Sequence, residues 1–397
     1  MKQYDEATYK KFFVVKKNEL CGFVTELKNE HWWQSFPLSR GEYPFIIEVP
    51  DGITTIKENA FSGLKSTTNG RVMVVLPEGV TTIEKGAFSG CEINKLLISD
   101  TVKTIDKDAF RLSKIGAIEV DKTSPSYKSV DGSLFDREMT TLIRYGGKGN
   151  EFEVPSTVSV IGKRAFENSS LLTSVYLGDN VVTIEDGAFY NSAIKQITLS
   201  SNVTSLGQNA FALCHNLSSF IIPYGLSSVS HRLFYGCTSL ESVTIPETVT
   251  TIGTESFFGC QLLRDIEIPH EIQTIGKGAF EGCKSLKDFP IPSCISAIEE
   301  RTFKGCNCFT DVIIPSNIER IGAQAFAYCK RLRSVNIGVN VNEIGEYAFL
   351  GCQKDITLIL SGKTRKEKLP FDKKWSLLSD GGLFKRKIKR IAYKQEE

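Results

Sequence analysis

The sequence lacks several features that would identify a function directly. Its 397 residues carry 48 Lys and Arg against 46 Asp and Glu, a formal net charge of +2, so charge does not point to nucleic acid or to an anionic membrane. No apolar run approaches the roughly 18 residues that a membrane-spanning helix needs. Near the N-terminus, Asp5 and Glu6 precede only four apolar residues, a pattern unlike a secretory signal. We therefore expect neither a membrane span nor a signal peptide.

Residues that carry catalytic and metal chemistry are also scarce. No Gly-x-Ser-x-Gly motif occurs, and Gly146-Gly147-Lys148-Gly149 lacks the spacing of a phosphate-binding loop. The chain has only four histidines, and none stands at metal-ligand or catalytic-triad spacing with a cysteine: His31, His215, His231 and His270. The sequence therefore predicts no catalytic residue, no cofactor, no metal site and no enzymatic activity.

What the chain does have is an internal repeat. Hydrophobic residues make up 41% and charged residues 24%, as in ordinary folded proteins. Within this background one aromatic residue, here called the marker Phe, recurs twelve times, and from Phe211 to Phe349 its spacing is a constant 23 residues. The marker positions are Phe61, Phe88, Phe110, Phe166, Phe189, Phe211, Phe234, Phe257, Phe280, Phe303, Phe326 and Phe349. A fixed period of this length is typical of solenoid proteins.

Three further columns run in register with the marker Phe. An aliphatic residue stands five positions before it in every row, for example Ile252 before Phe257, and another stands eight positions before it, for example Val249. Proline stands eleven positions before it in eight rows: Pro50, Pro77, Pro155, Pro223, Pro246, Pro269, Pro292 and Pro315. Agreement over twelve rows establishes the repeat unit, here called a row.

A row of about 23 residues cannot enclose a core alone, but stacked rows can cover one another. In the row that begins at Leu240, the side chains of Leu240, Val243 and Ile245 are expected to point inward, and Pro246 is expected to end a short strand. Twelve strands spaced about 4.8 Å apart predict a parallel sheet roughly 60 Å long. Residues 249–257 are expected to form a turn or a short helical piece on the opposite side.

The pattern from Cys237 to Cys260, C-x-x-L-x-x-V-x-I-P-x-x-V-x-x-I-G-x-x-x-F-x-G-C, resembles the BspA-type leucine-rich repeats of bacterial and protist proteins. The resemblance covers about residues 46–360. It implies an α/β-type repeat solenoid, a leucine-rich repeat array with a parallel β-sheet on one face, short helical or turn segments opposite, and terminal caps. It also implies an adhesion or protein-binding scaffold, and many members of the family are surface proteins.

The eleven cysteines follow the same register. Eight stand three residues after a marker Phe: Cys91, Cys214, Cys237, Cys260, Cys283, Cys306, Cys329 and Cys352. One cysteine per row is typical of a small buried hydrophobe rather than of a disulfide framework. We therefore expect packed, reduced thiols, which favours a cytoplasmic location. A cell-surface or extracellular location stays open as the alternative.

Three segments depart from the repeat. Residues 1–45 are expected to form an N-terminal cap, with Trp32 and Trp33 as an alternative anchor for a partner. Residues 46–360 form the predicted solenoid, in which residues 121–150 are an inserted, hairpin-like segment. That insertion could instead hold a deep polar pocket of an enzyme.

The third departing segment, residues 361–397, is basic, with twelve Lys and Arg against five Asp and Glu, a net charge of +7. We expect a C-terminal cap in which residues 384–391 form a final strand whose lysines protect the exposed edge. Nucleic acid, an acidic partner or a nuclear-import signal would be the alternative roles of these basic residues.

The outward positions of the predicted strands supply the candidate binding residues: Tyr176, Ile221, Asp265, Glu267, Asp288, Asp311 and Ile313. Three of them, Asp265, Asp288 and Asp311, fall in one column on consecutive rows, where like charges should cost stability. This acidic strip, with Glu267, is a candidate receptor for a basic partner surface, set against a plain structural interpretation of the same charges. Two alternatives are neutralisation by Arg264, Lys287 and Arg333, and a calcium site.

The sequence therefore favours a non-catalytic scaffold that displays an extended sheet to another protein. The alternative within the same family is a cell-surface adhesin or a host-interacting protein. No nucleic acid partner is expected, because no aromatic residues alternate with the basic ones as a stacking platform requires.

Overall fold

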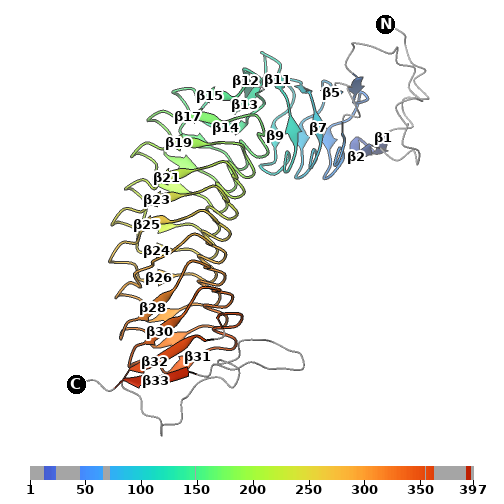
Figure 1. Ribbon diagram of the computed structural model, residues 1–397. Helices are drawn as coiled ribbons and strands as arrows, with labels where there is room; N and C mark the ends of the chain where they lie inside the picture. The colour runs from blue at the N-terminus through green and yellow to red at the C-terminus, as the bar shows by residue number, and fades with distance from the viewer. Residues whose placement is uncertain are drawn as a thin grey trace. The chain divides into compact units, whose positions relative to one another are not determined.

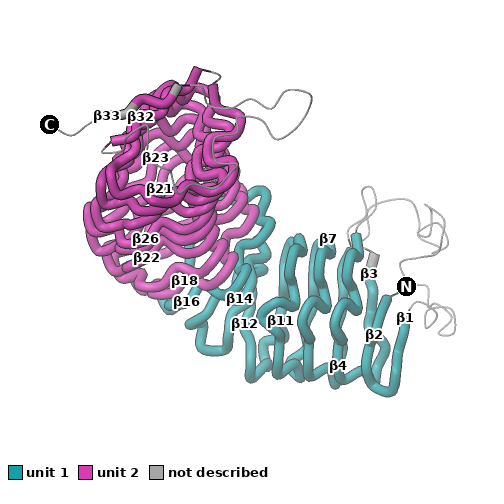
Figure 2. The backbone as a smooth tube through the Cα atoms, turned by 90° about the horizontal axis from the view of Figure 1, so that it is seen from below, with its two compact units in different colours: residues 1–172 teal, residues 173–397 magenta. Residues whose placement is uncertain are grey.

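The structure, a computed structural model, describes residues 13–23, 45–65, 72–147, 149–353, 355–361 and 390–394. It divides into two compact units, residues 1–172 and residues 173–397 (Figure 2). Within each unit the chain winds through successive short coils, so the predicted repeat solenoid is confirmed (Figure 1). Trp32 and Trp33 lie outside the described residues.

The first unit opens with an antiparallel hairpin of β1 (Phe13–Lys16) and β2 (Glu19–Phe23). One parallel ladder runs from β2 through β4 (Thr55–Ile56), β6 (Thr82–Ile83) and β9 (Thr104–Ile105). A second ladder joins β3 (Phe45–Glu48), β5 (Val72–Leu76), β8 (Lys95–Ile98) and β11 (Ile118–Val120), and a short pair joins β7 (Glu92–Ile93) and β10 (Lys114–Ile115). Two ladders on two sides of each coil enclose the apolar interior.

The inserted segment changes the strand direction. The strands β12 (Tyr127–Val130), β13 (Ser133–Asp136) and β14 (Thr141–Arg144) pair in antiparallel fashion, and β14 then pairs in parallel with β16 (Val160–Ile161). A separate strand, β15 (Glu151–Glu153), follows the meander. The insertion thus forms short strands, and we propose that they continue the stack.

In the second unit, the strands that precede the proline column form what we call the first ladder. It falls into three sheets: β17 (Ser174–Tyr176) and β19 (Gln196–Thr198); β21 (Ser219–Ile221), β23 (Ser242–Thr244) and β25 (Asp265–Glu267); and β28 (Asp311–Ile314), β30 (Ser334–Ile337), β32 (Thr357–Ser361) and β33 (Arg390–Lys394). Within each sheet the pairing is parallel and in register, as Val243 pairs with Ile266.

A second ladder of two-residue strands carries the aliphatic column that precedes each marker Phe by five residues. Its sheets are β18 (Thr183–Ile184) and β20 (Ser205–Leu206); β22 (Ser228–Val229), β24 (Thr251–Ile252) and β26 (Thr274–Ile275); and β27 (Ala297–Ile298), β29 (Arg320–Ile321) and β31 (Glu343–Ile344). Each coil therefore has two strand sides and one side made of turns.

The core consists of the columns that the sequence predicts. Leu240, Val243 and Ile245 are buried, and the marker Phe rings are almost completely enclosed. Successive rings stack, with centroids 5.2 Å apart between Phe257 and Phe280. Burial of each such ring stabilises the fold by roughly 1.5–3 kcal/mol, so the ring column is a main source of stability.

The turn side explains why the repeat contains Phe-x-Gly. Two residues before and two residues after Phe257, the backbone is left-handed, with φ of 53° at Glu255 and 72° at Gly259. These two left-handed residues redirect the backbone so that the Phe257 side chain points into the coil. Glycine adopts the left-handed conformation at the lowest energetic cost. The N–H of Phe257 then donates to the carbonyl of Ala279 in the next row at 2.9 Å, which links the turns.

One sequence-based expectation is not confirmed, and another requires correction. The described residues contain no helix, so the α/β class and the helical segments are not confirmed; with three sides in 23 residues, no side has the roughly 12 residues that a stable helix needs. The single continuous sheet is wrong, because the first ladder is divided into separate sheets. The last strand occupies residues 390–394, and residues 362–389 lie outside the described part.

Candidate functional site

The outward side chains of the first ladder in the second unit form the candidate face. Tyr176 on β17, Ile221 on β21 and Ile313 on β28 are 60%, 70% and 72% exposed. Large apolar side chains with this exposure gain nothing from the folded core. They are therefore available for contact with a partner.

The register brings some of the predicted residues together and leaves others apart. Ile221 stands opposite Thr244, which in turn stands opposite Glu267, so these outward side chains share one line across three strands. Asp265 and Glu267 share β25, and both are exposed. Tyr176 lies in the separate sheet of β17 and β19, opposite Thr198.

The acidic strip is neutralised only in part. Arg264 Nε lies 3.3 Å from Asp265 Oδ2, and Arg264 Nη2 lies 2.5 Å from Glu241 Oε2. Among the described residues, no ion pair reaches Asp288 or Glu267. Neutralisation by a neighbouring cation, which the sequence offered as an alternative, is thus found at Asp265 and not at Asp288.

Asp311 is held differently. Its Oδ1 accepts a hydrogen bond from Ser334 Oγ at 2.5 Å. The hydrogen bonds from the Ser334 and Thr310 side chains, with a smaller contribution from the charge of Arg333, hold the pKa of Asp311 below its usual range. Asp311 is therefore a carboxylate at neutral pH, fixed by hydroxyl groups and exposed to solvent.

Sequence reasoning missed an interruption in the middle of this strip. Residues 287–292 form no strand, although they occupy the row between β25 and β28. Within the described second unit, no backbone hydrogen bond joins residues 287–291 to either neighbouring row. The rows on either side keep theirs: Arg264 N–H donates to the Glu241 carbonyl at 3.0 Å, and Arg333 N–H donates to the Thr310 carbonyl at 2.7 Å.

The interruption opens a pocket of about 450 Å³. Its walls include Phe289 and Pro290 from the irregular row and Phe309 and Ile313 from the next. Asp288 and Asp311 also line the pocket, together with Lys287. Three of the predicted binding residues, Asp288, Asp311 and Ile313, therefore meet at one concave site, which the sequence pattern alone did not indicate.

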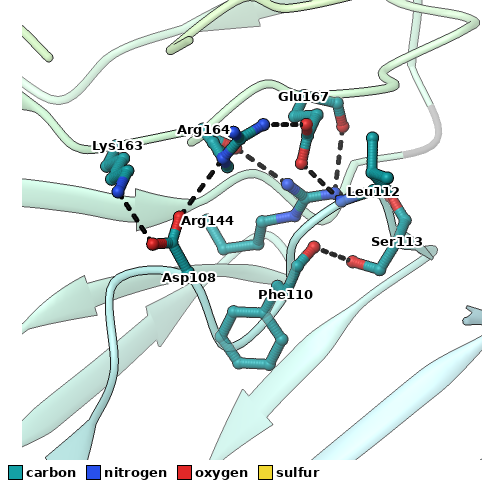
Figure 3. A network of polar contacts seen from close by, with 8 residues as sticks. All are labelled: Asp108, Phe110, Leu112, Ser113, Arg144, Lys163, Arg164 and Glu167. Carbon is teal, nitrogen blue, oxygen red and sulfur yellow. Dashed lines mark hydrogen bonds and ion pairs between the residues drawn. The ribbon is translucent and has the colours of Figure 1, made fainter. Parts of the chain in front are cut away.

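A buried polar cluster in the first unit was the other candidate, and it was not predicted. Arg144 on β14 is 3% exposed, and its guanidinium donates to three backbone carbonyls, those of Arg164 at 2.8 Å, Ser113 at 2.7 Å and Glu167 at 2.9 Å (Figure 3). The buried Glu167 side chain accepts from the Leu112 N–H at 2.6 Å and pairs with Arg164. Among the buried side-chain nitrogen and oxygen atoms of this described cluster, only Arg144 Nε has no hydrogen-bond partner.

Salt bridges extend this cluster to the surface of the unit. Asp108 lies 2.7 Å from Lys163 Nζ and 3.2 Å from Arg164 Nε (Figure 3). Burial opposes ionisation of Asp108, but these two cations outweigh it, and its pKa lies below the usual range. Because the cluster links residues 108–113 to residues 163–167, where the inserted segment separates two rows, we assign it a structural role.

The cysteine column is structural as well. In seven rows the thiol donates to a marker Phe carbonyl, as Cys260 Sγ does to the Phe234 carbonyl at 3.2 Å. Burial raises the pKa of each column thiol, to about 12 at Cys91, Cys214 and Cys352. No disulfide joins any of the eleven cysteines, all of which lie in described ranges. These thiols are packing groups rather than nucleophiles.

A family model now accounts for this architecture. The BspA type leucine rich repeat region matches in six copies, over residues 46–143, 144–261 and 227–356. These ranges cover residues 46–356, well over half of the chain. The chain belongs to the BspA-type leucine-rich repeat family. The resemblance drawn from the sequence is thereby confirmed.

Solved structures agree with this assignment. A leucine-rich repeat protein from Eubacterium ventriosum is 23% identical, with a TM-score of 0.55, and the match covers 71% of this chain and 76% of that one. A leucine rich cell surface protein from Faecalibacterium prausnitzii is 22% identical, with a TM-score of 0.51, over 94% and 96% of the two chains. At this level of identity the likeness establishes the fold.

Other comparisons add little for this BspA-type protein. The curated proteins include no match to the sequence. In the ranges that the structure describes, no group of three or more His, Cys, Asp or Glu is arranged to hold a metal ion. Over the same residues, we find no helix with the length and apolarity required to cross a membrane.

Proposed function

We propose that this BspA-type protein is a non-catalytic scaffold that binds a basic surface of another protein on the first-ladder face of its second unit. The observation that carries the proposal is the exposed carboxylate of Asp288, which has no cationic partner among the described residues and stands on the same face as Asp311 and Ile313. Such a charge contributes nothing evident to folding, but it would attract and orient a cationic partner. The family assignment supports a scaffold over an enzyme.

The test replaces the acidic strip without changing its shape. Partners retained from native lysate by the wild-type chain are identified, and their affinity is measured for the Asp265→Asn/Asp288→Asn/Asp311→Asn variant at low and high salt. We expect affinity to fall several-fold and its salt dependence to decrease, because the strip supplies the electrostatic part of the interaction.

A matched control carries the same loss of three charges away from this face. The variant Asp51→Asn/Glu78→Gln/Glu138→Gln changes three exposed acidic residues of the first unit. It should bind partners as the wild type does. If both triple variants lose affinity equally, or neither does, the acidic strip is not the binding site.

A surface-displayed adhesin is the second candidate function. It is supported by the family and by the likeness to a leucine rich cell surface protein, whereas these comparisons do not favour the cytoplasmic location that the free cysteines suggested. Labelling of intact cells with a membrane-impermeant amine reagent, followed by recovery of the protein, distinguishes the two. Labelling equal to that of a known surface protein would establish display, and labelling only after lysis would exclude it.

A further inference from the structure

The row of residues 285–298 departs from its neighbours in a specific way. Both ladders stop there: β25 is the last strand of one sheet and β28 the first of the next, and β26 and β27 do not pair. The turn side continues without a break, because Phe280 N–H donates to the Thr302 carbonyl at 2.9 Å and Gly282 N–H to the Lys304 carbonyl at 2.7 Å. Both ladders also stop between β19 and β21 and between β20 and β22, but here the row has no first-ladder strand at all while its turns stay closed.

Pro290 accounts for the opening in the first ladder. It occupies the outward position that Glu267 has one row earlier and Ile313 one row later, 23 residues away in each direction. A residue at this position in a parallel ladder must donate an N–H, which proline does not have. The carbonyl of the preceding row therefore has no donor, and the irregular row cannot lie flat between β25 and β28.

The side chains around the opening make it apolar inside. Phe289 packs edge-on against Phe280 and Phe303, with centroids 4.8 Å from each, yet it is only partly buried. Phe309 lies 5.6 Å from Phe303 and forms another wall. Val312, an inward residue of β28, is also only partly buried, whereas the equivalent Val243 is 2% exposed. The pocket therefore exposes surface that the row of Val243 keeps in the core.

The rim of the pocket is charged. Its charged lining residues are Asp288, Asp311 and Lys287, which gives a net charge of −1. The side chain of Ile313, 72% exposed, stands at the same site. A volume of about 450 Å³ with an apolar interior and a few polar groups is in the range of real binding pockets, roughly 300–1,000 Å³.

We propose that this opening, which we call the Pro290 pocket, is the anchor point of the binding face, and that it takes an aromatic side chain flanked by Lys or Arg in an extended segment of the partner. The ring would enter between Phe289 and Phe309, and a flanking cation would meet Asp288 and Asp311. Aromatic rings gain from edge-to-face contact with the phenylalanine walls as well as from burial. The proposal rests on the proposed scaffold function and specifies the chemistry of its partner.

The direct test uses short peptides as probes. Full-length protein labelled at isoleucine methyl groups is titrated with acetyl-Gly-Lys-Phe-Lys-Gly-amide, and the signals of Ile291 and Ile313, both in the pocket wall, are followed by NMR. We expect saturable shifts confined to these signals. The Lys-Ala-Lys peptide should bind roughly tenfold more weakly, because it lacks the buried ring. The Glu-Phe-Glu peptide should bind several-fold more weakly, since its charges face the acidic rim.

The matched protein variant is Pro290→Thr, which introduces the residue found at the same place in β23, Thr244, and restores the missing N–H. It should close the opening, raise thermal stability and abolish the peptide-induced shifts. A second variant, Asp288→Asn/Asp311→Asn, leaves the backbone unchanged. With it, the Lys-Phe-Lys and Glu-Phe-Glu peptides should bind alike. Equal binding of all three peptides to the wild type, or shifts spread over the chain, would overturn the proposal.

The same variants separate this inference from the scaffold proposal. If the triple aspartate variant loses the natural partner while Pro290→Thr keeps it, the face binds but the Pro290 pocket is not its anchor. If the pocket takes the Lys-Phe-Lys peptide as expected but the triple variant binds the natural partner normally, the pocket stands and the acidic-strip function fails.

Discussion

The cysteine column predicts an unusually steep loss of stability at alkaline pH. Burial raises the pKa of all eight column thiols, so in the folded chain they stay protonated well above the unfolded-state pKa of about 8.5. For a raised folded pKa, the stabilisation is complete below the unfolded pKa. It declines as pH rises towards the folded pKa, because only the unfolded chain loses protons.

The size of the effect follows from linkage. With an unfolded pKa of about 8.5, each thiol should lower the free energy of unfolding by about 0.8 kcal/mol between pH 7 and pH 9. Eight such thiols together would remove roughly 6–7 kcal/mol, a large part of a typical protein's stability of about 5–15 kcal/mol. A protein without this column would show little of this loss over the same interval.

The assay compares urea unfolding at pH 7, 8 and 9 for the wild type and for Cys260→Ala/Cys283→Ala. At pH 7 the variant should be somewhat less stable, because each deletion removes a buried side chain and one of the two hydrogen bonds that a marker Phe carbonyl accepts, at a net cost of about 0.5–1.5 kcal/mol per hydrogen bond. Between pH 7 and pH 9, however, it should lose about 1.6 kcal/mol less than the wild type.

The matched control is Cys294→Ala, since Cys294 is exposed and lies outside the column. It should follow the wild-type pH dependence. If the wild type and the double variant fall in parallel with pH, the column thiols do not ionise on unfolding as the linkage requires, and the reasoning is refuted.

The ring column and the buried cluster should each be sensitive to substitution. Phe257→Ala, in the middle of the ring column, should lower the free energy of unfolding by about 3–5 kcal/mol, as measured by chemical denaturation, and a loss below 1 kcal/mol would mean that the rings are not tightly packed. Arg144→Met should cost about 3–5 kcal/mol because the carbonyls of Ser113, Arg164 and Glu167 lose their shared buried donor, whereas Arg144→Lys, which keeps a donor at this site, should lose less. Because the pKa of Asp108 is lowered in the fold, its contribution to stability is present above the unfolded pKa of about 3.9 and is lost as pH falls below that value. Asp108→Asn should therefore make the free energy of unfolding depend less on pH in the acid range. An unchanged pH dependence would contradict this expectation.

Much of the fold could be predicted because repetition makes the core columns visible in one sequence. Leu240, Val243 and Ile245 are buried as expected, and the interval of 23 residues reappears as one coil. The sequence did not predict how the backbone of each coil is divided into two strand sides and one side made of turns. The left-handed conformation of Glu255, for example, is imposed by the stacked neighbours and not by its own side chain.

At the candidate site, the outward positions that recur in every row were predicted, whereas the irregular row and the contacts of the insertion were not. Asp265, Asp288 and Asp311 are exposed as the alignment of rows predicts. The pocket between the last two was missed, although Pro290 stands in the strand column of the sequence and proline within a strand pattern is a known signal of disruption. Arg144 gave no signal at all, because it lies in the insertion and its partners Ser113 and Glu167 are 31 and 23 residues away.

One row of the second unit provides an internal reference for the effect of Pro290. Phe220 occupies the position of Phe289 three rows earlier and makes the same two edge-on contacts, with centroids 4.8 Å from Phe211 and from Phe234. Yet Phe220 is 2% exposed and lies within a strand, whereas Phe289 is partly exposed and does not. The inward ring is therefore not the cause of the opening, and Pro290 in place of Ile221 is the difference between the two rows that removes a backbone donor.

Proline placed in an intact row should have the converse effect of Pro290→Thr. Thr244 pairs with Ile221 on one side and with Glu267 on the other, so Thr244→Pro should break the first ladder at β23 and leave a carbonyl unpaired, at a cost of about 1–3 kcal/mol. Hydrogen exchange should then accelerate in β21 and β23 but not along the turns at Phe257, whose bond to Ala279 belongs to the continuous side. Acceleration of the turn amides to the same degree would show that the two sides of a coil are not independent, and that Pro290 alone does not explain an opening confined to the strands.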